Sequence, residues 1–169
     1  YVLTNYYSSS DPTLYRFNPA LKNFTGVGTY YVDNLYFASC VIKGRDAFFL
    51  ANWNPVLLKK FNADDQTFSD MSTYPGSGWN NILLLDGDSV LYAGGGEIPA
   101  STSPSSGRDF YKYSPSRNKW TRLNDLPAGS GGTNEFTINR RCYILTKDGL
   151  LYEYSPSNDS WIRRADPPG

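Results

Sequence analysis

Tyr113-Ser-Pro-Ser-Arg-Asn-Lys-Trp120 and Tyr154-Ser-Pro-Ser-Asn-Asp-Ser-Trp161 are two copies of one pattern in a chain of 169 residues. Each copy has an aromatic residue, Ser-Pro-Ser, three polar residues and then Trp. A proline follows each Trp seven residues later, at Pro127 and Pro168. Such internal similarity indicates a fold that is built from repeated units.

The same spacing of two aromatic residues occurs twice more upstream. Phe61 and Phe68 enclose six residues, and Pro75 again follows seven residues after Phe68. Phe17 and Phe24 also enclose six residues, without the later proline. The second aromatic residues stand at positions 24, 68, 120 and 161, which gives spacings of 44, 52 and 41 residues. Periods of about 40 to 50 residues are typical of the blades of β-propellers.

We call each pair of aromatic residues, with the six residues between them, a signature. A short run of alternating hydrophobicity precedes each signature and predicts a strand that leads into it. These runs are Leu14–Phe17, Leu57–Phe61, Asp109–Tyr113 and Leu150–Tyr154. The polar segment between the two aromatic residues predicts a turn, because Pro presets φ and because Asn or Ser side chains bond the local backbone. The second aromatic residue then opens the next strand.

A hairpin of two further strands precedes that pair in the second, third and fourth units. The predicted pairs are Leu35–Ile42 with Ala47–Ala51, Ile82–Leu85 with Val90–Ala93, and Thr133–Ile138 with Cys142–Thr146. Gly or Asn in each short link is a hairpin signal. Four antiparallel strands are therefore expected in each of these units. The first unit begins at a stretch that corresponds to a second strand, so its innermost strand is not predicted.

The aromatic spacing, together with an apolar strand that ends in a glycine pair at Val90-Leu-Tyr-Ala-Gly-Gly95, resembles the kelch-repeat family. The other units have Thr4-Asn5, Ala51-Asn52 and Thr146-Lys147 in place of the glycines. The resemblance implies an all-β fold, a kelch-type β-propeller of about four four-stranded blades with an incomplete first blade. It implies one domain over residues 1–169, with units at 1–28, 29–75, 76–127 and 128–169. It also implies binding more often than catalysis.

The sequence does not decide how such a ring closes. A propeller needs its first and last blades to meet, because their edges otherwise remain exposed. Three arrangements satisfy this need: an irregular four-bladed ring, a piece of a larger ring, or two copies associated about a twofold axis. The third arrangement makes the protein a homodimer.

Aromatic residues outside the signatures concentrate in segments that a propeller places on one face. These segments are the loops between second and third strands and the connections between blades. Aromatic side chains on a rigid scaffold favour a recognition surface, although rings in such loops also cap the end of a core. The expected ligand-binding residues are Tyr6, Tyr7, Tyr30, Tyr31, Trp53, Asn54, Trp79, Asn80, Glu97 and Arg108.

The leading functional hypothesis is a non-catalytic recognition module that binds a protein, or a glycan, through this aromatic-rich face. One alternative is a carbohydrate-active enzyme that processes sialic acid or another sugar, with Glu97 and Arg108 at a polar site on the propeller axis. A second alternative is a structural piece that pairs with a second copy of itself. No catalytic residue is assigned.

The composition argues against several classes of site. Histidine is absent, which removes the Ser-His-Asp triad and histidine-based metal centres, so neither a metal nor a cofactor is expected. The chain has 16 basic and 16 acidic residues without a block of one sign, which disfavours nucleic acid as a partner. No apolar run approaches the length of about 18 residues that membrane insertion by a helix requires.

Cys40 and Cys142 fall in units that are not neighbours, so both are expected to be free, buried thiols. Two N-glycosylation sequons, Asn23-Phe-Thr and Asn158-Asp-Ser, fall in turns that should be exposed. The sequons slightly favour an extracellular or cell-surface location over a cytoplasmic one, and the sequence does not assign a location.

Overall fold

The computed structural model describes residues 2–4, 13–29, 39–51, 56–76, 81–87, 90–96, 107–127, 134–146 and 148–164. All regular elements within these ranges are β-strands, and they form antiparallel sheets. The all-β expectation is therefore confirmed for the described part of the chain.

The described strands form four sheets, and within each sheet these strands pair with their neighbours in the sequence. Sheet 1 contains β1 (Val2–Thr4), β2 (Thr13–Asn18) and β3 (Asn23–Thr29). Sheet 2 contains β4 (Ser39–Lys43), β5 (Asp46–Ala51), β6 (Leu57–Asn62) and β7 (Thr67–Thr73). Sheet 3 contains β8 (Ile82–Asp86), β9 (Val90–Gly94), β10 (Phe110–Ser114) and β11 (Lys119–Arg122). Sheet 4 contains β12 (Asn134–Ile138), β13 (Arg141–Leu145), β14 (Leu151–Ser155) and β15 (Ser160–Arg163).

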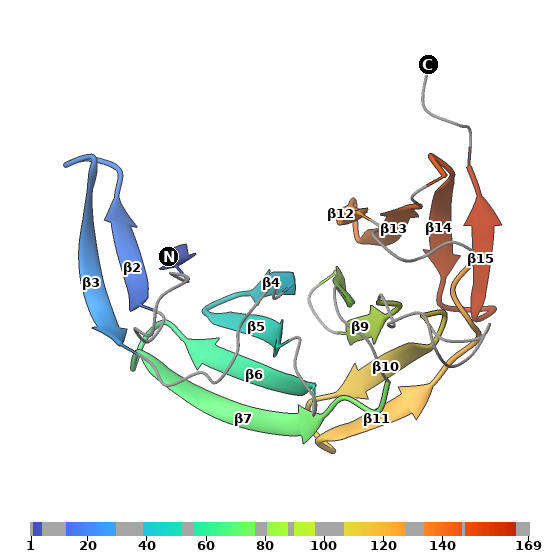
Figure 1. The fold of residues 1–169 in the computed structure, drawn as a ribbon, viewed down its shortest axis with the longest axis horizontal. Coiled ribbons are helices and arrows are strands. Elements are labelled where there is room, and N and C mark those ends of the chain that lie inside the picture. The colour runs from blue at the N-terminus through green and yellow to red at the C-terminus, as the bar shows by residue number, and fades with distance from the viewer. Residues whose placement is uncertain are drawn as a thin grey trace.

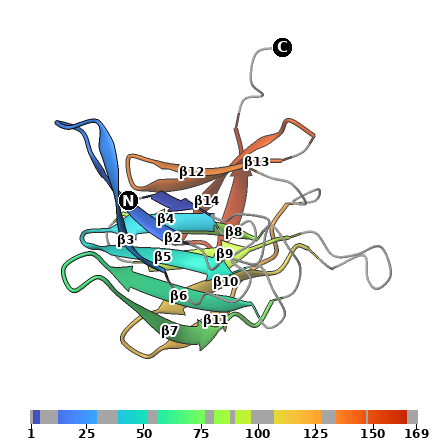
Figure 2. The ribbon, with the colours of Figure 1, turned by 60° about the vertical axis from the view of Figure 1, so that its left-hand side comes forward.

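The sheets follow one another in chain order along an open arc, with sheets 1 and 4 at its two ends (Figure 1). The first strands of sheets 2 and 4, β4 and β12, lie on the concave side of the arc, and β7 and β11 lie on its convex side (Figure 1). From the side, the strands of sheet 2 are stacked in order from β4 to β7 (Figure 2).

The strands expected from the repeat agree with those observed to within one or two residues over the described ranges. Asp109–Tyr113, for example, corresponds to β10, and Val90–Ala93 corresponds to β9. Sheet 1 contains three described strands and the other sheets contain four, as the repeat predicts.

The spacing of the signature aromatic residues encodes a hairpin in which two rings lie directly opposite each other. The cross-strand pairs are Phe17 with Phe24, Phe61 with Phe68, Tyr113 with Trp120, and Tyr154 with Trp161. Their ring centroids are 4.9, 5.0, 4.9 and 5.0 Å apart. Aromatic pairs of this kind contribute about 0.5–1.5 kcal/mol beyond the area they bury. The two N-terminal copies, although weak in sequence, keep the geometry of the other two.

The turn inside each hairpin ends with a residue in the left-handed region. The φ angles are 50° at Lys22, 57° at Gln66, 47° at Asn118 and 46° at Asp159. Asn and Asp adopt this conformation more readily than other non-glycine residues. In the two units that begin with Tyr, the Tyr113 hydroxyl donates to Asn118 Oδ1 at 2.7 Å, and the Tyr154 hydroxyl donates to Asp159 Oδ1 at 2.9 Å.

Two hydrophobic clusters fill the spaces between sheets. The first joins sheets 2 and 3 and includes Leu58, Leu91 and Trp120. The second joins sheets 3 and 4 and includes Phe110 and Tyr154. Sheet 3 is therefore covered on both faces. In both clusters the signature rings of the later sheet point toward the earlier sheet.

Hydrogen bonds between sheets recur at equivalent positions of the repeat. Asn118 Oδ1 accepts from the Ser72 amide at 2.9 Å, and Asp159 Oδ2 accepts from the Asn124 amide at 3.0 Å. Ser72 and Asn124 each lie four residues after the second aromatic residue of the preceding sheet. The left-handed turn residue thus ties its own sheet to the one before it.

Candidate functional site

Most of the predicted ligand-binding face lies outside the described residues. This applies to Tyr6, Tyr7, Tyr30, Tyr31, Trp53, Asn54, Trp79, Asn80 and Glu97. The structure does describe the strand ends that flank these segments. In a four-stranded antiparallel sheet the second strand ends, the third begins and the fourth ends at one edge, meaning the edge formed by strand ends and not by an outer strand. The segments that follow β5 and β7 of sheet 2, which contain Trp53 and Trp79, therefore leave the sheet at the same edge.

Arg108 is the predicted site residue that falls within the described ranges. It is half-buried just before β10. Its Nε donates to the Leu126 carbonyl at 3.0 Å, and the Leu126 amide donates to the Arg108 carbonyl at 2.7 Å. These bonds hold the segment after β11 against the start of β10, so the side chain serves the packing of sheet 3.

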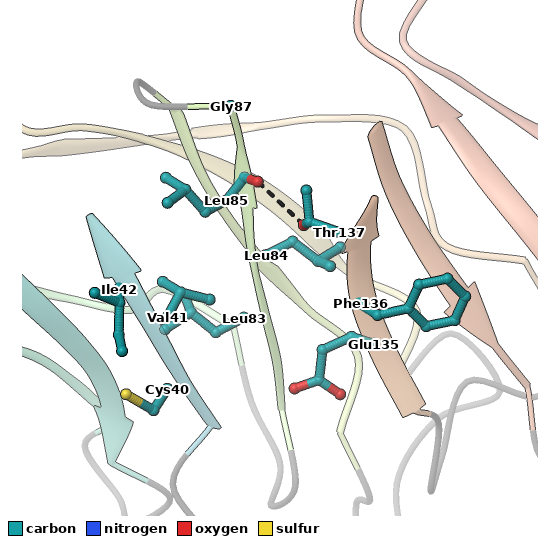
Figure 3. A pocket seen from close by; sticks show the side chains of 10 residues that line it. All are labelled: Cys40, Val41, Ile42, Leu83, Leu84, Leu85, Gly87, Glu135, Phe136 and Thr137. Atoms are coloured by element: carbon teal, nitrogen blue, oxygen red, sulfur yellow. Dashed lines mark hydrogen bonds between the residues drawn. The ribbon is translucent and has the colours of Figure 1, made fainter. Parts of the chain in front are cut away.

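The inner strands of sheets 2, 3 and 4 line an open hollow of about 390 Å³ (Figure 3). Its volume is in the range of small-molecule pockets. The lining is mostly aliphatic, and Glu135 alone among the ten described lining residues has an ionisable carboxylate. The lining residues are Cys40, Val41, Ile42, Leu83, Leu84, Leu85, Gly87, Glu135, Phe136 and Thr137.

Glu135 on β12 accepts a hydrogen bond from sheet 2. The Ser39 hydroxyl on β4 donates to Glu135 Oε1 at 2.6 Å. Next to it on β12, the Thr137 hydroxyl donates to the Leu85 carbonyl at 3.1 Å (Figure 3). Burial raises the pKa of the Glu135 carboxyl, and the hydrogen bond from Ser39 opposes this rise.

Glu135 is the one carboxyl group among the described lining residues, and Glu97, which the enzyme alternative needs, lies outside the described residues. Hydrolysis of a glycoside commonly uses a pair of carboxyl groups, one as acid and one as nucleophile or base. The described lining residues provide one carboxyl group. Sequence reasoning did not connect Ser39 with Glu135, because the two residues are 96 positions apart and no motif links them.

The expectation of two buried thiols is wrong for one of them. Both cysteines are free, and Cys142 is buried, but Cys40 is exposed. Val41 packs toward sheet 3, so the alternation of β4 turns Cys40 toward the sheet 1 side. No fourth strand of sheet 1 lies among the described residues to cover it. Partial desolvation raises the pKa of Cys40 to about 11 and that of Cys142 to about 12, so neither is a reactive thiolate near pH 7.

The two sequon asparagines both lie at exposed turns on the edge opposite to the predicted ligand-binding segments. Asn23 begins β3, and Asn158 lies between β14 and β15. Both side chains are exposed, which an acceptor of an N-linked glycan must be.

The two ends of the arc each expose large apolar side chains. The sheet 1 end face consists of Tyr15, Phe17 and Phe24, of which the two Phe side chains are exposed. The sheet 4 end face consists of Phe136, Ile138, Tyr143, Leu151 and Ile162. Phe136, Ile138 and Ile162 are among the exposed large apolar residues of the described chain. Contiguous apolar surfaces of this kind often mark interaction sites.

Among the residues that the structure describes, no three His, Cys, Asp or Glu side chains are grouped so that they could hold a metal ion. Over the same ranges, no helix is long and apolar enough to cross a membrane.

No protein-family model matches the chain, and no curated protein matches it. Matches are found among solved structures, in 118 chains. One of them is the structure of YjhT, with a TM-score of 0.66 and 17% sequence identity. The two share a fold. The match covers 81% of this chain and 53% of the YjhT chain, so this chain spans about half the length of that structure.

Proposed function

We propose that the chain is a non-catalytic recognition module that binds a protein partner. In this proposal the four sheets are the blades of a kelch-type β-propeller, and the aromatic-rich segments between them form the binding face. One observation carries the proposal. The segment with Trp53 follows β5, the segment with Trp79 follows β7, and both strands end at the same edge of sheet 2. A rigid scaffold that presents several aromatic segments together is suited to recognition.

Contacts between sheets 2 and 3 support the rigidity of that edge. The Tyr74 hydroxyl, just after β7, donates to Asp109 Oδ2, just before β10, at 3.2 Å. Burial, together with the neighbouring Asp109 carboxylate, raises the pKa of Tyr74, so its hydroxyl keeps the proton that it donates. A side chain at Gly76 would clash with Asp109 Oδ2, so the backbone approaches closely at this point. The start of the Trp79 segment is thus fixed against sheet 3.

The residue types favour a protein ligand. Trp, Tyr and Arg are enriched at the centres of protein interfaces, where large rings exclude water from neighbouring polar contacts. Trp53 and Trp79 are each followed in the sequence by an asparagine, Asn54 and Asn80. The same rings would also stack on sugars, so a glycan ligand is the contrasting outcome of the test.

The test compares three forms of the 169-residue chain on immobilised peptide and glycan libraries. The Trp53→Ala/Trp79→Ala double variant should lose binding at least tenfold to any peptide that the unchanged chain binds, with a thermal midpoint within a few degrees. Leu21→Ala, at an exposed turn on the opposite edge, is the control and should bind as the unchanged chain does. Binding that survives in the double variant, or that is lost only with folding, would overturn the proposal.

A further inference from the structure

Sheet 1 exposes the residues that sheet 3 buries at the same positions of the repeat. Phe17 and Phe24 are 43% and 56% exposed, whereas Tyr113 and Trp120 are 1% and 8% exposed. In sheets 3 and 4 the signature rings pack on the preceding sheet. In sheet 1 the equivalent rings therefore face the side on which another sheet would lie.

Sheet 4 exposes the complementary kind of face. Phe136 lies opposite Tyr143 across β12 and β13, as Leu84 lies opposite Tyr92 across β8 and β9. Sheet 3 buries Leu84 and Tyr92 against sheet 4, with 1% and 2% exposure. Phe136 is 37% exposed and stacks on Tyr143 with ring centroids 5.3 Å apart. The sheet 4 end face thus has the pattern of a face that is covered elsewhere in the same chain.

The interface between sheets 3 and 4 indicates which side chains would meet. Phe110 lies 5.0 Å from Tyr154 and 5.1 Å from Trp161, measured between ring centroids. Phe110 precedes Tyr113 by three residues, and Leu151 precedes Tyr154 by three residues, so Leu151 is its counterpart in sheet 4. Phe17 and Phe24 are the counterparts of Tyr154 and Trp161 in sheet 1. A sheet 1 docked on sheet 4 would place the Phe17–Phe24 pair on Leu151.

We propose that two copies of the chain dock head to tail, with the sheet 1 end face of each copy on the sheet 4 end face of the other. A twofold axis relates the copies and repeats the interface, so both open ends of both arcs are covered. This interaction surface contains none of the residues that are predicted for the proposed recognition function.

Two observations favour a second copy as the occupant. The chain itself carries both halves of the interface, and it forms interfaces of the same kind between sheets 2 and 3 and between sheets 3 and 4. The 16 basic and 16 acidic residues balance, so two copies carry no net charge that would drive them apart.

A charged group lies within the sheet 4 end face, because Glu153 on β14 lies opposite both Tyr143 and Ile162, and this group is already paired. Glu153 accepts from Arg141 Nη1 at 3.2 Å and from Arg164 Nε at 2.8 Å. The face can therefore be covered without leaving the Glu153 carboxylate unpaired, which is the condition for burying a charge.

The test is the mass of the 169-residue chain in solution, measured by size-exclusion chromatography with light scattering. We expect twice the chain mass of 18.9 kDa at a concentration of about 50 μM, with dissociation on dilution. Phe24→Asp and Leu151→Asp, one on each end face, should both shift the mass to that of one chain. Leu21→Asp is the matched control, because the counterpart of Leu21 in sheet 3, Arg117, stays exposed although that sheet is covered.

Circular dichroism and thermal unfolding of each variant separate lost association from lost folding. If either Asp variant unfolds, Phe136→Arg replaces it, since that side chain is partly exposed and sits on a hairpin strand. A mass of one chain for the unchanged protein at about 50 μM would overturn the proposal and assign the end faces to other sheets. A double mass that persists in the folded end-face variants would overturn it as well. The Trp53→Ala/Trp79→Ala variant should keep the double mass. The mass therefore tests the association of two copies, and binding to the libraries tests the recognition function separately.

Discussion

Sheets 1 and 3 contain the same aromatic hairpin in different surroundings. The rings of Phe17 and Phe24, and those of Tyr113 and Trp120, are 4.9 Å apart in both cases. Sheet 3 has a neighbour on each face, whereas the Phe17–Phe24 pair of sheet 1 is exposed. The aromatic spacing therefore specifies the hairpin, and the burial of the hairpin depends on the sheet that lies against it.

The difference extends to the turn that joins the two aromatic residues. In sheet 3, Asn118 bonds both its own Tyr113 and the preceding sheet through Ser72. In sheet 1 the equivalent residue is Lys22, which has the same left-handed backbone, and the equivalent of Tyr113 is Phe17, which has no hydroxyl. The specific signature of the C-terminal units thus belongs to hairpins that are tied to a preceding sheet.

The largest expected effect compares one substitution at two equivalent positions. Phe61→Ala removes a ring that is 1% exposed and should lower the free energy of unfolding by about 3–5 kcal/mol. Phe17→Ala removes an exposed ring and should cost about 1 kcal/mol, mainly through its pairing with Phe24. Urea denaturation at low protein concentration, where the proposed association of two copies would be absent, measures both. Equal losses would show that burial does not distinguish the two sheets.

A smaller effect compares the turn residues of the two hairpins. Asn118→Ala should cost about 2 kcal/mol, because it leaves the Tyr113 hydroxyl and the Ser72 amide without their acceptor. Lys22→Ala should change stability by at most about 0.5 kcal/mol, because it keeps the same left-handed strain at an exposed position. Asn118→Asp keeps the acceptor oxygens and is the control. The comparison fails if Lys22→Ala is as harmful as Asn118→Ala in urea denaturation.

The smallest effect concerns the pKa values of two carboxyl groups, one on the covered face of sheet 4 and one on its open face. Burial raises the pKa of Glu135, which lies toward sheet 3. At Glu153, burial acts in the same direction, but the hydrogen bond from Arg164 and the charges of Arg164 and Arg141 outweigh it and lower the pKa. Glu153 therefore stabilises the fold above its ordinary pKa of 4.5, and this contribution is lost as the pH falls through its lowered folded pKa. Glu135 acts in the opposite sense, since its ionisation in the unfolded chain above pH 4.5 favours unfolding.

Thermal midpoints of Glu153→Gln and Glu135→Gln at pH 7 and pH 3 test this sign difference. At pH 7, Glu153→Gln should lower the midpoint by a few degrees, and Glu135→Gln should raise it by a similar amount. At pH 3 both differences should shrink, because both carboxyl groups are then largely protonated in either state. A change of the same sign for both variants at pH 7 would contradict the assignment of the two faces.

The strands could be predicted from the sequence because the hairpin is a local structure. Two rings seven positions apart, with a polar turn between them, are enough to set the register of Tyr113 against Trp120. The arrangement of the sheets relative to one another has no such local signal. The Ser39–Glu135 contact and the exposure of Cys40 both depend on which strands lie beside β4, and the repeat does not encode that. The aromatic ligand-binding residues remain a prediction from sequence.

The pairing of every strand with its neighbours in the chain has a consequence for the order of folding. Most connections within the sheets are short, the longest being that between β9 and β10, and short loops close quickly and with little loss of entropy. A sheet can therefore form while the following one is still being synthesised, since chains emerge at about 5–20 residues per second. The arc would grow on the ribosome one sheet at a time, and only the packing of finished sheets on one another would have to wait for distant parts of the chain.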